Sequence, residues 1–263
     1  MAKTETLATG AEILLQTLKS NGVDTIFAIT GAGNLAIIDA IARDGEVKLI
    51  YSHHEQAAAM EAQGYSRITG KLGVVLVTTG AGTSNVVTGV LGAHLDSIPI
   101  LVISGNESSF HCANPNQLRA YGVQGFDSCA VLAPISKKSC RVMNVEDISK
   151  TVQKLIYVAL EDRQGPTHFD FPMDLQRKKI DSSESTRYED LESKLHLSGE
   201  TALDKLVEKI SNSKSPIIYF GNGVRKEQSL ELAKSLIDKT GIPFFVSWSA
   251  IDLFPESLSL IHI

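Results

Sequence analysis

Short apolar runs alternate with stretches that repeat apolar positions at helical spacing, from near the start of the chain onward. The runs are apolar at consecutive positions, which is typical of strands buried on both faces of a parallel sheet. The predicted strands lie at residues 25–30, 47–52, 73–80 and 99–105. The predicted helices lie at residues 11–22, 34–45, 55–70 and about 84–94. This alternation predicts an α/β fold, an open parallel sheet with helices on both faces and right-handed crossovers.

The first domain closes with the same pattern after one long interruption. Residues 106–130 are irregular and contain Gly, Asn, Pro and Gln. A long loop inside a compact α/β unit is often functional. Helical spacing over 145–162 and an apolar run over 166–172 follow, so we place the first domain at residues 1–178.

The composition changes after this strand. Residues 173–200 are polar and rich in charge and serine, and they predict a linker, which we place at 179–198. A helix, a strand, a helix and a strand then begin a second α/β domain over 199–263. Two strands and two helices rarely make a stable core, so we expect this domain to be incomplete in this chain. The alternative is a short piece that packs on the first domain.

Composition narrows the classes of function. The 263 residues are 43% hydrophobic and 21% charged, which is ordinary for a globular protein. The net charge is −5 and Lys and Arg are scattered, which argues against a nucleic-acid partner. No apolar run reaches the roughly 20 residues that span a bilayer, and the first residues lack a secretory signal, so we expect no membrane partner. Three cysteines without a CxxC pair argue against disulfides or zinc and favour the cytoplasm.

A glycine-rich turn follows the first predicted strand. "GAGNLA" matches G-x-G-x-x-A at Gly31, Gly33 and Ala36, and Glu55 lies about 20 residues further on. Taken alone, this arrangement favours a dinucleotide-binding oxidoreductase. However, a complete helix precedes the strand, and Glu55 stands three residues beyond the next apolar run. A tight structural turn explains the glycines equally well.

A second glycine pair, Gly80 and Gly82, follows the third predicted strand in "VTTGAGTSNVVTG". This turn lacks the lysine of a phosphate-binding P-loop, which argues against a nucleoside triphosphatase. The neighbouring "HHEQAA" lacks the second histidine of HExxH, so His53 and His54 give little support for a zinc hydrolase. Without further information, Glu55 is an acidic residue in the first turn of a helix.

Taken in order, several longer segments are more specific than either turn. "FAITGAGNLAIIDAI", "HHEQAAAMEAQGYSRITGKLGVVLVTTGAG" and "GPTHFDFPMDLQ" resemble the thiamine-diphosphate-dependent acetolactate synthase family. The resemblance covers the pyrimidine-binding N-terminal domain of that family, about residues 5–178, and implies the thiamine-diphosphate-binding fold. "PIIYFGNGVR" at 216–225 resembles the start of the family's central domain.

The resemblance implies roles for individual residues. In that family the glutamate of "HEQ", here Glu55, hydrogen-bonds the aminopyrimidine of the cofactor and promotes the imino form that takes up the carbon-bound proton. Gln124 matches a glutamine that orients the substrate, so Glu55 and Gln124 are the implied catalytic residues. The implied cofactor-binding residues besides Glu55 are Gly31, Ala32, Gly33, Thr79 and Asn85.

The sequence departs from the family pattern at the acceptor end of the site. Ala32 replaces a commoner glycine, Thr30 a commoner proline, and Met173 a lysine, while Val123 stands where an aromatic residue is usual. The resemblance implies decarboxylation of a 2-keto acid such as pyruvate and transfer of the acyl fragment to a second carbonyl. The departures leave the acceptor open between pyruvate, 2-ketobutyrate, an aldehyde and a sugar ketone.

The remaining implied features concern what lies beside this chain. The family holds the diphosphate and Mg²⁺ through a GDG…N run of a C-terminal domain, which this sequence lacks. Its active site lies between subunits, so the resemblance implies a homo-oligomer, and FAD is a further candidate cofactor. We therefore expect the chain to be truncated or completed by another subunit, and inactive alone. A non-catalytic subunit that needs a partner is the third hypothesis beside the synthase and the oxidoreductase.

Overall fold

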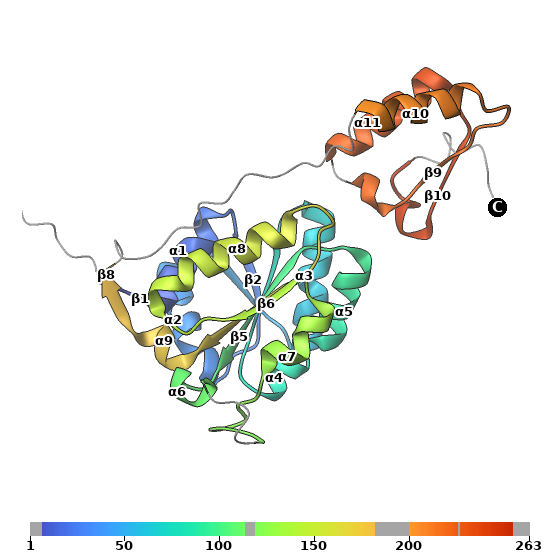
Figure 1. The fold of residues 1–263 in the computed structure, drawn as a ribbon. Helices are drawn as coiled ribbons and strands as arrows, with labels where there is room; N and C mark the ends of the chain where they lie inside the picture. Colours follow the sequence, from blue (N-terminus) through green and yellow to red (C-terminus); the bar gives the residue numbers. More distant parts are fainter. Residues whose placement is uncertain (1–6, 114–118, 182–199, 226, 255–263) are drawn as a thin grey trace, which may run out of the picture. The chain divides into compact units, whose positions relative to one another are not determined.

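The computed structural model describes residues 7–113, 119–181, 200–225 and 227–254 (Figure 1). The chain divides into two compact units, Met1–Leu191 and Glu192–Ile263. The predicted linker spans residues 179–198. The structure describes its first three positions, and residues 182–198 lie outside the described residues. All candidate site residues belong to the first unit.

A six-stranded parallel sheet forms the centre of the first unit, in the order β3-β2-β4-β5-β7-β6. Its strands are β2 (Thr25–Ala28), β3 (Lys48–Tyr51), β4 (Gly73–Val77), β5 (Ile100–Asn106), β6 (Lys138–Arg141) and β7 (Thr167–Pro172). Every residue of β4, β5 and β7 is buried, as the continuous apolar runs predicted. The predicted open parallel α/β sheet is therefore confirmed.

Helices cover both faces of this sheet (Figure 1). One core cluster joins the sheet to α1 (Gly10–Ser20), α2 (Leu35–Asp44) and α8 (Ile148–Leu160). The other joins it to α3 (Glu55–Thr69), α5 (Val87–Asp96) and α7 (Ser128–Leu132). Shorter helical segments are η1 (Ala32–Asn34), α4 (Ala81–Ser84), α6 (Ser109–Cys112), η3 (Ala133–Ile135), η4 (Val145–Asp147) and α9 (Met173–Arg177).

The helix ends follow local sequence signals. Thr9 and Glu12 form a capping box at the start of α1, with Thr9 Oγ1 accepting from Glu12 N at 3.2 Å. The last residues of α2 and α3 are followed by Gly45 and Gly70, both in the left-handed conformation. These are the glycines at which the sequence predicted those two helices to end.

Two segments differ from the expectation. The helix predicted at about 84–94 is α5, which begins at Val87 and ends at Asp96, and a separate short helix, α4, precedes it. The polar stretch at 173–200 begins as folded structure, because α9 buries Leu175 and Gln176. Beyond it, β8 (Lys179–Asp181) pairs antiparallel with β1 (Leu7–Thr9), in the first three positions of the predicted linker. The average polarity of the stretch hid these few inward-facing side chains, and the domain boundaries stay a prediction.

The second unit is small. It contains α10 (Glu200–Ser211), β9 (Ile218–Phe220), η6 (Asn222–Arg225), α11 (Glu227–Thr240), β10 (Phe244–Val246) and η7 (Trp248–Ala250). The two strands pair in parallel, and a small cluster of buried apolar residues packs Phe220, Ala233, Phe244 and Phe254 together. Many apolar side chains stay exposed, among them Val207, Leu232 and Trp248. Within the described parts of the chain, no helix has the length and apolar character that a membrane span requires.

Candidate functional site

The sheet order makes a topological switch point between β2 and β4, where open α/β sheets form a crevice at the strand ends. From β2 the chain moves outward to β3 on one side, and it then returns to place β4 on the other side of β2. Ligands of open α/β sheets bind outside the carboxyl ends of the strands at such a switch point. The turns after β2 and after β4, which hold the two glycine pairs, both lie at this edge of the sheet.

The two glycine turns pack directly against each other. The amide of Gly33 donates to Thr78 Oγ1 at 3.1 Å. A Cβ on Gly31 would collide with the side chain of Thr78, and a Cβ on Gly33 would collide with Thr79 Oγ1. Both positions therefore require glycine because of close approach. Ala32, between them, is exposed at the crevice edge of the turn.

Glu55 is the first residue of α3 and is half-buried. Asn85 Nδ2, from the two-residue turn between α4 and α5, donates to Glu55 Oε2 at 2.9 Å. Glu55 Oε1 faces Gly82, where an added Cβ would lie 3.3 Å from this oxygen. Among the described residues, no Lys, Arg or His forms an ion pair with Glu55.

The histidines before Glu55 differ in their surroundings. His54 is the N-cap of α3, and its Nδ1 accepts from the amide of Gln56 at 3.1 Å. His53 is exposed. In the described part of the chain, no three His, Cys, Asp or Glu side chains gather in a way that could hold a metal ion.

Gln124 reaches the same edge from the long loop after β5. It has φ +66°, which is unusual for a residue with a side chain, and it packs on Gly80, which has φ +69°. A Cβ on Gly80 would lie 2.5 Å from Gln124 Cβ and 2.7 Å from its Oε1. Gly80 is therefore needed both for its conformation and for room. The preceding residue, Val123, is exposed.

The structure thus brings all seven sequence-predicted site residues to one edge of the sheet. Glu55 and Asn85 are hydrogen-bonded, and Gly31, Gly33 and Thr79 meet at the paired turns. Gln124 joins them through Gly80. Thr79 Oγ1 is buried and has no hydrogen-bond partner among the described residues.

Sequence reasoning missed two residues of the site. Thr78 supplies the hydroxyl oxygen that accepts from the Gly33 amide. Its only sequence signal was its position directly before Thr79 in "VTTGAG". Gln176 is fully buried on α9, and its Nε2 donates to Gly33 O at 2.7 Å and to Phe171 O at 2.8 Å. Gln176 ends the segment "GPTHFDFPMDLQ" that carries the family resemblance, but nothing in the sequence gave this side chain a role.

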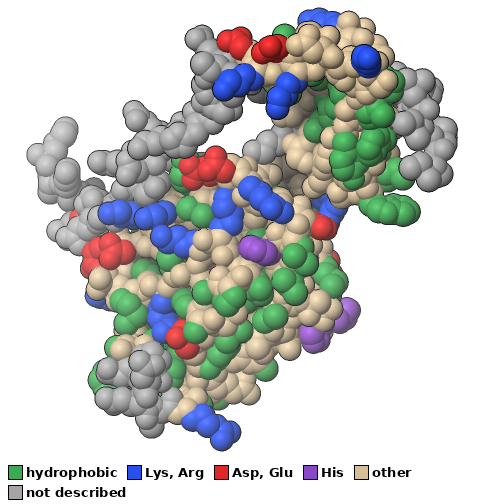
Figure 2. Space-filling model, turned by 45° about the vertical axis from the view of Figure 1, so that its right-hand side comes forward, with side chains coloured by type: hydrophobic (Ala, Val, Ile, Leu, Met, Phe, Trp, Pro, Cys, Tyr) green, Lys and Arg blue, Asp and Glu red, His purple; other side chains and the backbone are tan. Residues whose placement is uncertain are grey.

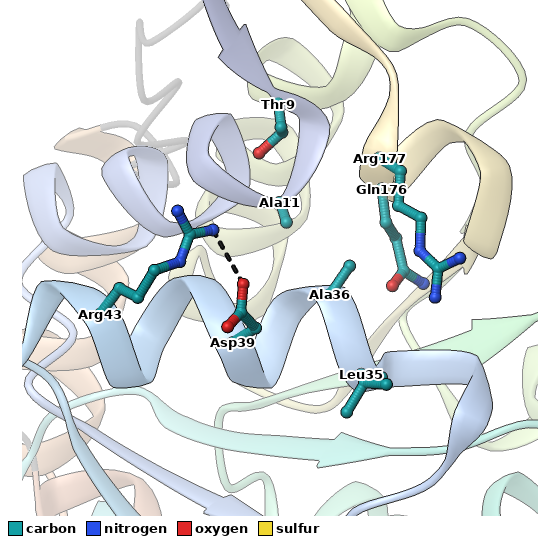
Figure 3. Close-up of a pocket in the computed structure, with 8 residues that line it drawn as sticks. All are labelled: Thr9, Ala11, Leu35, Ala36, Asp39, Arg43, Gln176 and Arg177. Carbon is teal, nitrogen blue, oxygen red and sulfur yellow. Dashed lines mark ion pairs between the residues drawn. The ribbon is translucent and has the colours of Figure 1, made fainter.

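A hollow of about 400 Å³ lies behind the glycine turn, between α1, α2 and α9 (Figure 3). Gln176 and Arg177 reach it from α9, and Arg43 pairs with Asp39 at 2.9 Å on its wall. The other lining residues are Thr9, Ala11, Leu35 and Ala36. None of the sequence-predicted site residues lines this hollow, so it is separate from the crevice that holds Glu55.

Comparisons with known proteins identify the family. The family description "Thiamine pyrophosphate enzyme, N-terminal TPP binding domain" matches residues 8–130, and "Thiamine pyrophosphate enzyme, central domain" matches residues 203–261. The acetolactate synthase large subunit of Lactococcus lactis is 32% identical over 98% of this chain and 44% of its own length. Acetolactate synthase 2, chloroplastic, of Nicotiana tabacum is 32% identical over 95% of the chain and 37% of its own length.

The large subunit from Haemophilus influenzae is 33% identical, over 94% of the chain and 43% of its own length. The chain therefore spans less than half the length of these curated relatives. The resemblance drawn from "HHEQ" and the glycine turns is confirmed. The chain belongs to the thiamine pyrophosphate enzyme family, with the N-terminal TPP-binding domain and central-domain sequence similar to those of acetolactate synthases.

Proposed function

We propose that this chain forms part of an enzyme that uses thiamine diphosphate to decarboxylate a 2-keto acid and transfer the acyl fragment to a second carbonyl. The observation that carries the proposal is the Glu55–Asn85 pair at the switch point, with a carboxylate oxygen facing the glycine-walled crevice. Family membership supports the cofactor class, and the names of the relatives support the acetolactate-synthase-like reaction.

The residues present fit the pyrimidine end of such a cofactor. A heterocycle with ring nitrogens and an amino group needs a carboxylate, further polar atoms and a wall without side chains. Glu55 Oε1 and the partnerless Thr79 Oγ1 offer the polar atoms, and Gly31, Gly33 and Gly82 offer the wall. Both oxygens can form further hydrogen bonds to a ligand, beyond those they make within the described part of the chain.

The chemistry of the chain's own side chains follows from this placement. Glu55 exchanges a proton at Oε1 with a ring nitrogen of the bound heterocycle, while Asn85 holds Oε2 in a fixed orientation. The start of α3 places the positive end of the helix dipole beside this carboxylate. When bound, thiamine diphosphate would supply the carbon nucleophile that this chemistry on a 2-keto acid requires.

We assign substrate positioning to Gln124, because its side chain lies over Gly80 at the open edge of the crevice. Pyruvate is the proposed donor, and the acceptor stays open, since the sequence departs from the family pattern at Ala32, Val123 and Met173, which the resemblance assigns to the acceptor end. Mg²⁺ and FAD remain predictions that rest on the family resemblance alone.

The proposed assembly is a homo-oligomer with the active site at the subunit interface. Apolar side chains are exposed on α3 and α5, which pack side by side: Met60, Ile68, Leu91 and Leu95. Figure 2 views the side of the first unit on which α5 lies, and hydrophobic side chains gather there. An apolar face of this kind supports an interface close to the helix that carries Glu55.

The test uses the complete gene product, because the chain spans 44% of its relative from Lactococcus lactis. We expect pyruvate consumption only with thiamine diphosphate and Mg²⁺, and a thermal midpoint raised by about 3 °C at saturating cofactor. NAD(P) should leave the midpoint unchanged. A shift with NAD(P) alone contradicts the proposal and favours the oxidoreductase.

Absence of turnover together with capture of a second protein that restores it favours the subunit hypothesis. This outcome is distinct, because thiamine diphosphate then raises the midpoint only of the assembled pair. Cytoplasmic localisation stays a prediction from cysteine usage.

A further inference from the structure

A buried carboxylate next to the site has no role in the proposed mechanism. Glu107 directly follows β5 and is 9% exposed. Its amide donates to the side chain of Asn106 at 2.8 Å, so the backbone is fixed where the carboxylate leaves the sheet. Carboxylates are seldom buried unless their oxygens are bonded, and this one has no ion-pair partner among the described residues.

The Glu107 carboxylate binds the turn that carries Gln124. Glu107 Oε1 accepts from the amide of Val123 at 2.9 Å. The carboxyl group also lies directly under Gly122, where an added Cβ would collide with it. Gly122 has φ +57°, so the turn bends around the carboxylate through a glycine.

The turn is closed at its base by backbone and side-chain bonds. Tyr121 and Gly125 exchange two backbone hydrogen bonds, of 3.2 Å and 2.9 Å. Tyr121 Oη donates to Phe126 O at 2.6 Å. These bonds fix the two ends of the turn, whereas the Glu107 carboxylate is what holds its tip.

The tip is held in a conformation that the chain does not favour by itself. Gln124 adopts a left-handed φ of +66°, which residues with a side chain adopt rarely. In this conformation its side chain turns toward Gly80, while Val123 points outward. Without an acceptor for the Val123 amide, the neighbouring peptide would be free to relax and move Gln124 from the crevice.

We propose that Glu107 is a positioning residue, which acts through the Val123 amide to hold Gln124 over Gly80 at the substrate end of the site. The inference rests on the proposed function for its kinetic consequence. The placement of Gln124 by Glu107 is a separate, structural claim. Two experiments on the complete gene product therefore test the two parts.

The first experiment measures amide hydrogen exchange at the turn. In Glu107→Ala, the Val123 amide should exchange at least about 10-fold faster than in the wild type, because its acceptor is lost. The Gly125 amide, bonded to Tyr121 O, should keep its rate. Glu161→Ala is the matched control, because this glutamate also accepts one hydrogen bond, from Tyr157, but lies far along the chain on the C-cap of α8. Unchanged exchange at Val123 overturns the structural claim.

The second experiment compares kinetics. Glu107→Ala should lower kcat/KM for substrate by about 100-fold, as expected when a substrate-positioning group is displaced. Thiamine diphosphate affinity should stay at the wild-type value. Glu107→Gln keeps an acceptor oxygen for the amide and should restore most of the activity. Adding Glu107→Ala to Gln124→Ala should cause little further loss, because both changes remove the same interaction.

The functional part of the inference is overturned if Glu107→Ala speeds hydrogen exchange at the Val123 amide but keeps the wild-type kcat/KM. The functional part is also overturned if the loss of kcat/KM in the double variant equals the product of the losses in the two single variants. A wild-type protein without thiamine-dependent turnover contradicts the proposed function instead, and the exchange rates then decide the placement of Gln124 on their own.

Discussion

Two carboxylates at opposite parts of the same sheet have very different surroundings. Glu55, beside β2 and β4, receives one hydrogen bond and has no cation near it among the described residues. Asp170, on β7, is fully buried, and its Oδ2 accepts from Arg141 Nε at 2.7 Å, Ser128 Oγ at 2.6 Å and Asn106 Nδ2 at 2.9 Å. Arg141 balances its charge, and this ion pair raises the pKa of Arg141 against the opposing effect of burial.

The difference distinguishes a carboxylate that is available to a ligand, Glu55, from one that stabilises the fold, Asp170. Burying an unpaired charge is costly, so a half-buried carboxylate that faces a crevice suggests a group kept available for a ligand. Asp170 instead joins three elements, since its partners come from β5, β6 and α7. Glu55 variants should therefore change activity with little change in stability, and variants near Asp170 should do the reverse.

The largest expected effect is on activity in Glu55→Gln. The amide cannot exchange the proton at Oε1, so we expect thiamine-dependent turnover to fall by about 10³-fold to 10⁴-fold, roughly 4–5 kcal/mol. The thermal midpoint should stay within about 2 °C, because the Asn85 bond needs only an acceptor oxygen. Steady-state kinetics and calorimetry check both halves.

Glu61→Gln is the matched control on the same helix. Glu61 is exposed, and it accepts a hydrogen bond from Ser52 at 2.5 Å. It should keep wild-type turnover. If Glu55→Gln retains turnover, or loses as much stability as activity, the separation of the two regions is wrong.

The next effect is on stability in Asp170→Ala. Removing the carboxylate leaves the Arg141 guanidinium mostly buried without its main partner, so we expect a loss of about 4 kcal/mol in the free energy of unfolding. Asp127→Asn is the control, because Asp127 reaches Arg141 at 3.4 Å, its side chain is 45% exposed, and Asn keeps an acceptor for the Ala130 amide that Asp127 caps. It should cost about 0.5 kcal/mol. Denaturant unfolding of both variants gives the comparison, and equal losses would remove the scaffold role of Asp170.

How far the sequence could predict these regions depended on the spacing of their parts. Glu55 was accessible, because its motif is contiguous and the next glycine turn follows a strongly apolar strand. The Glu55–Asn85 contact was not, since it joins residues 30 positions apart, on helical segments that meet only in the folded sheet.

The second region gave no sequence signal of comparable strength. Ser104 is a polar residue in the apolar strand β5, whereas Ser139 and His168 lie in β6 and β7, which hold other polar residues. Their partnership depends on the register of β5, β7 and β6, in which Ser104 pairs with Asp170 and Ser139 with His168. Register between parallel strands joined by a crossover is a tertiary property, so sequence spacing alone could not reveal it.

The third prediction concerns pH and His168. Its Nε2 lies 2.8 Å from Ser104 Oγ and its Nδ1 lies 2.8 Å from Ser139 Oγ, inside the sheet. Burial lowers the pKa of His168 to about 4. Because the folded state favours the neutral ring, its contribution is complete above the unfolded pKa of about 6.5 and is lost as the pH falls toward 4. The loss should be about 3 kcal/mol, measured by unfolding between pH 7 and pH 4.

His168→Asn isolates this contribution from that of the carboxylates, which titrate at the lower end of the same range. Its unfolding free energy should depend less steeply on pH between 6.5 and 4 than that of the wild type. Identical slopes in the two proteins would show that the ring is not responsible.

The smallest effect sharpens the first region. Asn85→Ala removes the donor to Glu55 Oε2, and a hydrogen bond to a charged group contributes about 1.5–2 kcal/mol, so turnover should fall by roughly 10-fold to 30-fold. Ser84→Ala is the control, because the exposed Ser84 hydroxyl donates to the carbonyl of Ala81 within the same turn and has no other partner in the described parts of the chain. Its turnover should match the wild type. In a Glu55→Gln background, Asn85→Ala should cost much less than in the wild type, since the group that Asn85 orients no longer exchanges the proton. An equal cost in both backgrounds would mean that Asn85 acts on the ligand directly, and the carboxylate would then need another explanation for its fixed position.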